Sequence, residues 1–405
     1  MRRTSSPFSG LLDTPELTDS ARAVLRTIAT SGPSTRPQLS ATLNFSKPTM
    51  SAAVSELERH GLVAPAGINR GGVGRTSVTY SVGREAGLVI GIDCGTTQIH
   101  AIACGIDGSQ VAEVEKASRS MTGSERFDAI ETVIGEVLQQ CPDHAPFLRT
   151  IVIALPNIIS PTLERLPDRA PFLSALDRIG AAYRVPILLE NNVNCAALAE
   201  YHHGAARNHS FTIYMQIGVK VGVGIVIGGK LFRGFKGGAG EIGHLPFPWS
   251  EHHQPRPSHV EAYLGSAALL QRAAAVWPAS EASPPETTSQ LFAMAEQGGT
   301  ARTVIERHAH DIGNLAAACV SLLDPELIVV GGGVGQNAIL LPGIRETVES
   351  LCWPVEIVSS ELSNRATVLG SVRLARDFTL ARLLGEEAKA SYLHQGDQAS
   401  RLVSV

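Results

Sequence analysis

The chain of 405 residues has little that would place it in a membrane. No apolar run reaches the roughly 18 residues that a membrane-spanning helix needs. The N-terminus carries Arg2 and Arg3, but no apolar stretch follows them, so a secretory signal peptide is not indicated. We therefore expect a cytoplasmic protein with no membrane partner.

Cysteine is sparse as well, and its six residues are scattered along the chain. No two of them have the CxC or CxxC spacing of a disulfide framework or a cysteine zinc site. We therefore expect reduced thiols and no bound cofactor. The six are Cys94, Cys104, Cys141, Cys195, Cys319 and Cys352.

A strong net charge is also missing, since the formal total is only −4. That total hides two parts of opposite sign. Residues 1–85 hold 10 Lys and Arg against 6 Asp and Glu, whereas the remaining residues hold 24 against 32. A basic N-terminal part on an acidic body is typical of a DNA-binding domain joined to a sensor or an enzyme.

Residues 19–83 have the pattern of a winged helix-turn-helix domain. The preceding residues 1–18 are rich in Ser, Thr and Pro, so we expect a flexible N-terminus. Apolar spacing predicts a first helix over residues 21–29, capped by Asp19 or Ser20. Stop signals follow that helix, and two further helices are expected before the wing.

The second helix is predicted over residues 36–43, and the third runs from a Ser46 cap to about His60. The third helix would bury Met50, Val54 and Leu57. Its opposite face is short and polar with one cation, which suits entry into a DNA major groove. The candidate DNA contacts on this face are Lys47, Thr49, Ser51 and Ser55.

A glycine-rich segment between two strands, within residues 62–82, predicts the wing. Its tip carries Arg70 and Arg75, and arginine suits a narrow minor groove. The alternative is a small helical bundle that serves protein association. The order of three helices and a basic wing favours DNA binding.

From residue 87 onward, strands alternate with helices, which predicts an α/β body. We expect a first lobe over 87–200, a second over 201–375, and a C-terminal helix and tail over 376–405. Strands are predicted at 88–92, 99–105, 150–155 and 186–189, and helices near 124–140 and 171–182.

Three glycine-bearing turns of this body are candidates for phosphate binding, because glycine lets backbone N–H groups approach an anion. Glycine is equally ordinary in turns, so each segment alone is weak evidence. The candidate residues are Asp93, Gly95, Thr96, Gly218, Gly331, Gly332 and Gly333.

Asn, Glu and His side chains gather after the predicted strands of the body. Carboxylates and amides can each bridge neighbouring hydroxyls of a sugar. The alternative for any one of them is a helix cap or a surface pair. The candidate sugar-binding residues are Asn191, Asn192, Glu241, His244 and Glu261.

Together these segments resemble the ROK family of sugar-responsive repressors and sugar kinases. The most specific segment is residues 235–244, Phe-Lys-Gly-Gly-Ala-Gly-Glu-Ile-Gly-His, and the likeness covers roughly residues 20–380. It implies two actin-like or hexokinase-like α/β lobes with sugar held in their cleft. The N-terminal winged helix-turn-helix marks the family's regulator branch.

The resemblance places the family's sugar contacts on Asn191, Glu241, His244 and Glu261. It also places the kinases' catalytic aspartate at Asn192, where a neutral amide cannot accept a hydroxyl proton. The second phosphate loop loses a hydroxyl residue at Val219. We therefore expect no catalytic residue, and phosphate loops that persist only as structure.

The family's cysteine zinc segment is absent here, because residues 251–261 contain no cysteine. A histidine-rich site of His244, His252 and His259 is one alternative, and a metal-free loop is the other.

Function then has three readings. The first is a repressor that binds operator DNA as a homodimer or homotetramer and senses a sugar or sugar derivative. The second is a regulator whose sugar cleft has decayed, and the third is an ATP-dependent sugar kinase. Retention of the sugar-contact residues favours the first reading over the second, and Asn192 argues against the third.

Overall fold

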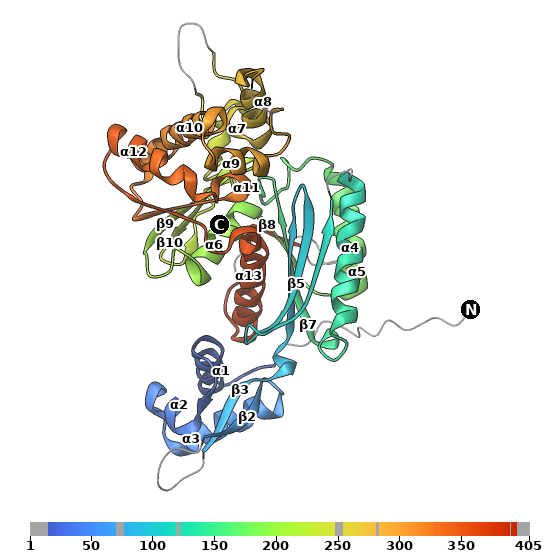
Figure 1. Cartoon of the computed structure of the whole chain (residues 1–405). Helices are drawn as coiled ribbons and strands as arrows, with labels where there is room; N and C mark the ends of the chain where they lie inside the picture. The colour runs from blue at the N-terminus through green and yellow to red at the C-terminus, as the bar shows by residue number, and fades with distance from the viewer. Residues whose placement is uncertain are drawn as a thin grey trace, which may run out of the picture. The chain divides into compact units, whose positions relative to one another are not determined.

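The computed structural model describes residues 15–69, 77–118, 121, 123–247, 254–280, 283–388 and 390–394 (Figure 1). Its contacts divide the chain into unit 1, Met1–Glu190 with Ser371–Val405, and unit 2, Asn191–Gly370. In this division helix α6 (Asn192–His203) lies as a whole in unit 2, and most of the last helix lies in unit 1. The lobe bounds 87–200 and 201–375 stay a prediction.

The N-terminal domain of unit 1 has the predicted order of three helices and a wing. Its second and third helices match the predicted bounds, and its three-stranded sheet has the order β1-β3-β2. The elements are α1 (Asp19–Ser31), β1 (Ser34–Thr35), α2 (Arg36–Leu43), α3 (Lys47–Arg59), β2 (Val63–Asn69) and β3 (Ser77–Val82).

Two details at the start of this domain differ from the prediction. The residue that caps α1 is Thr18, whose hydroxyl accepts from the Ala21 N–H, instead of Asp19 or Ser20. Residues 15–18 are also ordered, because Leu17 is buried and Thr18 is hydrogen-bonded to α3. An apolar side chain ahead of the helix thus joins the domain core.

A six-stranded sheet forms the rest of unit 1, in the order β14-β8-β7-β4-β5-β6. Strand β4 pairs antiparallel with β5 and parallel with β7. The elements are η1 (Arg84–Ala86), β4 (Leu88–Cys94), β5 (Gln98–Gly105), β6 (Gln110–Ala117), α4 (Gly123–Gln140), η2 (Ala145–Phe147), β7 (Leu148–Leu155), α5 (Arg169–Tyr183), β8 (Ile187–Asn191), α13 (Ala366–Leu383) and β14 (Tyr392–His394).

Helices cover both faces of this sheet (Figure 1). Helices α4 and α5 share one apolar core with the strands, in which the rings of Phe127 and Phe172 lie 4.6 Å apart. Helix α13 covers the other face, where the buried hydroxyls of Thr150 and Thr379 are 2.8 Å apart.

Unit 2 is built on a five-stranded sheet of order β11-β10-β9-β12-β13. Helix α6 packs on β9 and β10 with its own small core, and most of the other helices share a second core with the strands. The elements are α6, β9 (Phe211–Ile217), β10 (Val221–Ile227), β11 (Lys230–Leu231), η3 (Ile242–His244), α7 (His259–Leu264), α8 (Ser266–Val276), α9 (Thr288–Glu296), α10 (Gly299–Leu323), β12 (Leu327–Gly331), α11 (Gly332–Gly335), η4 (Ala338–Leu340), α12 (Leu341–Leu351), β13 (Glu356–Ser359) and η5 (Ser363–Arg365).

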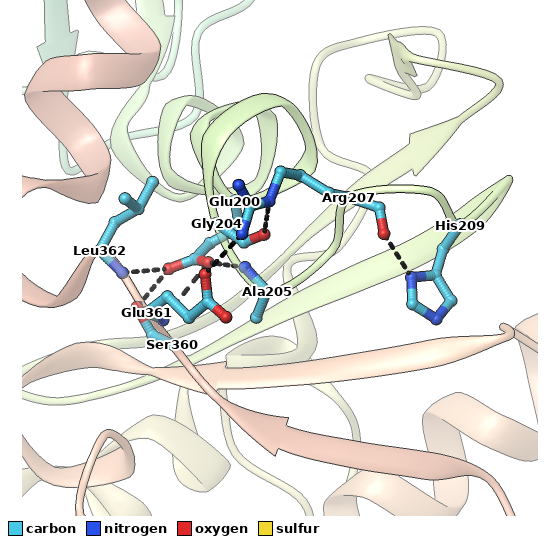
Figure 2. A network of polar contacts seen from close by, with 8 residues as sticks. All are labelled: Glu200, Gly204, Ala205, Arg207, His209, Ser360, Glu361 and Leu362. Carbon is cyan, nitrogen blue, oxygen red and sulfur yellow. Dashed lines mark hydrogen bonds and ion pairs between the residues drawn. The ribbon is translucent and has the colours of Figure 1, made fainter.

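A buried carboxylate joins α6 to the loop that follows β13 (Figure 2). Glu200 is fully buried and accepts hydrogen bonds from the Ala205 N–H at 2.8 Å and the Leu362 N–H at 3.0 Å. The Ser360 hydroxyl donates to it as well. A buried charge is tolerated when donors surround it, so Glu200 fixes both segments in place.

Within the described residues, every helix is too short or too polar to cross a bilayer.

Candidate functional site

The N-terminal half of α3 presents a small polar surface. Lys47, Thr49, Ser51 and Ser55 are all exposed, while Met50 on the other side is buried. The Ser46 hydroxyl accepts from the Thr49 N–H at 3.3 Å and so caps the helix. Its hydroxyl also lies 2.8 Å from that of Thr49, which orients the first turn.

Two acids near the end of α3 are engaged within the domain. Glu56 accepts from the Thr18 N–H at 2.8 Å and the Thr18 hydroxyl at 2.6 Å. Burial alone would raise the pKa of Glu56, but these hydrogen bonds lower it. Glu58 pairs at 3.3 Å with Arg36, which also stacks over the Tyr80 ring. Both carboxylates are thus tied to other parts of the domain.

The wing is described as two paired strands, β2 and β3, with Val63 opposite Val82. The predicted contacts Arg70 and Arg75 lie outside the described residues. Their role at the tip of the wing stays a prediction.

The two asparagines proposed for sugar contact open helix α6. Asn191 is its N-cap, and its side-chain oxygen accepts from the N–H groups of Val193 at 2.8 Å and Asn194 at 3.2 Å. Asn192 is the first helical residue. The Asn191 side-chain oxygen therefore caps the helix, which is the alternative role considered for these residues in the sequence.

Glu241, His244 and Glu261 lie on η3 and α7 or at their borders. A Cβ built on Gly243 would be 3.6 Å from the Glu261 carboxylate oxygen Oε2, so α7 brings that acid against η3. His244 Nδ1 lies 3.4 Å from the Ser258 hydroxyl. These groups can accept and donate hydrogen bonds to a polyhydroxyl ligand.

Strand β10 touches the segments that carry both groups. The Val193 side chain of α6 lies 3.4 Å from a Cβ built on Gly222, and the Val223 N–H donates to the Gly240 oxygen at 2.8 Å. The first half of this strand therefore touches both the start of α6 and the segment that leads into η3. Two segments distant in sequence thus pack on one strand of unit 2, and the sugar-binding role of their side chains stays a prediction.

Two of the glycine turns lie beside each other in unit 2. A Cβ on Gly218 would be 3.4 Å from the Gly333 backbone nitrogen. A Cβ on Gly331 would be 2.2 Å from the Tyr214 hydroxyl. Gly332 has a φ of +85°, and a Cβ on it would be 2.6 Å from the Ile217 carbonyl oxygen. A side chain at Gly331 or Gly332 would therefore clash with its neighbours, and a role of these turns in phosphate binding stays untested.

The third turn, with Gly95 and Thr96, follows β4 in unit 1. Burial raises the pKa of Asp93, the acid of this turn, to about 7. Its Oδ1 is buried, and the described residues offer it no hydrogen-bond partner. A carboxyl group in this setting is protonated over part of the neutral range.

The proposed histidine metal site cannot be followed through all three residues, since His252 lies outside the described residues. Across the described part of the chain, no three His, Cys, Asp or Glu side chains are grouped to hold a metal ion. The metal alternative stays a hypothesis.

Sequence reasoning missed Glu200, Thr367 and Gly370. The Thr367 hydroxyl donates to the Asn192 carbonyl at 3.4 Å, and Gly370 packs on the backbone of α6. Each contact joins residues more than 150 positions apart, so no local pattern signals it.

Known proteins resemble the chain over almost its full length. A ROK family model matches residues 89–378, and a MarR family model matches residues 16–67. The xylose repressor of Caldicellulosiruptor bescii is 27% identical over 377 residues, with 87% of this chain and 94% of the relative covered.

Solved structures agree with this likeness. A ROK family transcriptional regulator, a homolog of the E. coli MLC protein, has a TM-score of 0.70 at 21% identity and covers 90% of this chain and 95% of its own. A ROK glucokinase of Streptomyces griseus, in complex with glucose and AMPPNP, has a TM-score of 0.60 at 25% identity and covers 72% of this chain and 99% of its own. The match to the glucokinase thus leaves more than a quarter of this chain uncovered, whereas the match to the transcriptional regulator covers nearly all of it. With a family model over well more than half its length, the chain belongs to the ROK family and carries a MarR-like winged helix domain ahead of the ROK body.

Proposed function

We propose that this chain is a sugar-responsive repressor that binds operator DNA through its winged domain. The observation that carries the proposal is the presence in one chain of an exposed polar face on the first half of α3 and of a ROK body. Relatives that match 86% and 87% of this chain are named xylose repressors. A pentose or hexose is therefore the class of effector that the body would bind.

The effector would be held in unit 2 by the side chains around β10. Asn191, Glu241, His244 and Glu261 supply amide, carboxylate and imidazole groups, which bond sugar hydroxyls in both directions. Asn192 would add a hydrogen bond without accepting a proton. This assignment rests on the residue types and on the contacts that their segments make with β10 through Val193 and Gly240.

We propose that the body does not catalyse phosphoryl transfer. General-base catalysis needs a group that accepts the sugar hydroxyl proton near neutral pH, and the amide of Asn192 has no such capacity. A coupled assay with ATP and a panel of sugars should show no turnover above the protein-free rate. Robust phosphorylation of any panel sugar would contradict this proposal.

Operator recognition would need at least a dimer, because two recognition helices then read two half-sites. Thr49 and Ser51 would face base edges, and Lys47 would contact phosphate.

The decisive experiment is a genome-wide map of binding sites, followed by anisotropy titration of the recovered operator. The sugar panel is D-xylose, D-glucose, N-acetylglucosamine and glucose 6-phosphate. A repressor of this kind loses operator affinity with one of them. Unchanged operator affinity with every sugar, together with no heat of sugar binding, would leave the decayed-cleft reading instead.

A further inference from the structure

The chain passes between the two units after Glu190 and again after Gly370. Within unit 2 the two passages touch. The Thr367 hydroxyl donates to the Asn192 carbonyl at 3.4 Å, and a Cβ on Gly370 would lie 1.8 Å from the Cys195 carbonyl oxygen. The start of α13 therefore packs on the backbone of α6, the helix that begins with the proposed sugar-binding asparagines.

Farther along, α13 packs on strand β4 of unit 1 as closely as its start packs on α6. A Cβ on Gly91 would be 2.4 Å from the Val372 backbone nitrogen, so helix and strand β4 meet at backbone distance. The Thr150–Thr379 contact holds the next two turns. Helix α13 (Ala366–Leu383) is thus one continuous helix with close backbone contacts near its start and farther along.

The end of α13 meets the DNA-binding domain within unit 1. Arg26 of α1 forms an ion pair with Glu386, 360 residues away in sequence. A Cβ on Gly385 would be 3.3 Å from Cζ of Arg22, one helical turn before Arg26. We call this contact of Arg22 and Arg26 with Gly385 and Glu386 the latch.

A second attachment holds the connecting segment at η1. Arg149 donates to the Glu85 carbonyl at 3.0 Å, and the Arg84 guanidinium lies 5.5 Å from the centre of the Phe147 ring. One attachment leaves a domain free to rotate about its connection. The latch and the η1 contacts together give the DNA-binding domain two attachment points within unit 1.

We propose that the latch carries the effector state of α6, through α13, to the DNA-binding domain. The proposal rests on the proposed function. Two recognition helices must match the separation of two half-sites, so a small rotation of each domain changes operator affinity. Effector binding alters operator affinity only if the two states differ in such contacts.

The test compares operator affinity with and without saturating sugar for Arg26→Ala and Glu386→Ala in the full chain. Each variant should reduce the ratio of the two dissociation constants about two- to fivefold, the range of a half-exposed ion pair. Exchange of the charges, Arg26→Glu with Glu386→Arg, should restore the ratio. Sugar affinity without DNA, measured by calorimetry, should stay as in the wild type.

The matched control is Arg373→Ala, which removes a partly exposed ion pair inside α13, to Asp377 at 2.8 Å. It should leave the ratio unchanged, and thermal melts should show all variants folded. If the latch variants behave as Arg373→Ala does while the wild type responds to sugar, the latch proposal alone is overturned. If no panel sugar changes the operator affinity of the wild type, both the proposed function and the latch proposal are overturned.

Discussion

Single side chains carry the proposal that this ROK body does not catalyse phosphoryl transfer. Asn192 stands at the start of α6, where the resemblance places a kinase aspartate, and its carbonyl is tied to Thr367. The amide side chain keeps hydrogen-bonding capacity but loses basicity. At this scale the sequence was informative, because a residue type can be read without a structure.

Replacement of Asn192 by Ala should weaken effector binding about two- to tenfold, the usual net worth of one hydrogen bond. Calorimetry with the panel sugar that affects operator binding measures this change. The exposed Asn314→Ala on α10 is the matched control and should bind as the wild type does. Equal affinities for both variants would remove Asn192 from the sugar site.

Asp93 makes stability depend on pH. Its pKa in the folded chain is about 7, against an ordinary value of 3.8. Between about pH 4 and 7 the folded chain keeps a proton that the unfolded chain releases, so stability falls as pH rises through that window. Asp93→Asn should remove this penalty.

The gain for Asp93→Asn should be on the order of a few kcal/mol above pH 7 and should vanish near pH 4. Thermal melts at both pH values measure it. Asp143→Asn, at an exposed position, should show no such pH dependence. A gain for Asp93→Asn that is equal at both pH values would disprove the protonation argument.

At the scale of elements, local signals predicted the DNA-binding domain well. Pro48 after the Ser46 cap and the buried spacing of Met50, Val54 and Leu57 define α3 without help from the rest of the chain. The prediction failed at Thr18, because that cap depends on contact with Glu56 of another helix. Signals within one helix can be read in advance, whereas those shared between helices cannot.

On α3, Lys47→Ala should lower affinity for all DNA sequences and reduce the salt slope by about one. Ser51→Ala should instead change the preferred bases while keeping the salt slope. Anisotropy titrations over a salt series, against a library of operator variants, separate the two effects. If both variants change affinity in the same way for every sequence, α3 does not read bases as proposed.

Helix α13 should tolerate no side chain where it meets α6. Gly370→Ala would place a Cβ 1.8 Å from the Cys195 oxygen, and such overpacking costs about 1–3 kcal/mol. Gly135→Ala in α4 is the control, since its nearest neighbour is 3.8 Å away and alanine favours helix. Urea denaturation should show a loss for the first variant and no loss for the second.

For the whole molecule, the distribution of charge fits the proposal that the N-terminal domain binds DNA and the body binds a sugar. The basic excess lies in residues 1–85, and the acidic body would repel DNA. Sequence reasoning reached this arrangement and the α/β body, but it did not indicate that the chain crosses between two units after Glu190 and again after Gly370. Boundaries depend on which sheet a strand joins, and pairing such as Leu393 with Leu188 is invisible in local sequence.

A dimer that reads two half-sites should be sensitive to their spacing. Inserting about five base pairs, half a helical turn, between the half-sites should abolish specific binding. Inserting a full turn should restore part of it. Gel-shift titrations of the three DNAs provide the measurement, and equal affinity for all three would indicate that single domains bind independently.

Because the chain crosses between the units twice, unit 2 is synthesised completely before unit 1 is. Unit 2 is one continuous segment, Asn191–Gly370, whereas unit 1 is completed only when α13 and β14 emerge. Until then the face of β4 around Gly91 lacks its covering helix, and the edge of β8 lacks its partner strand. A nascent chain therefore finishes its inserted unit first and exposes an open sheet edge, a site for chaperones or for aggregation, until the last forty residues arrive.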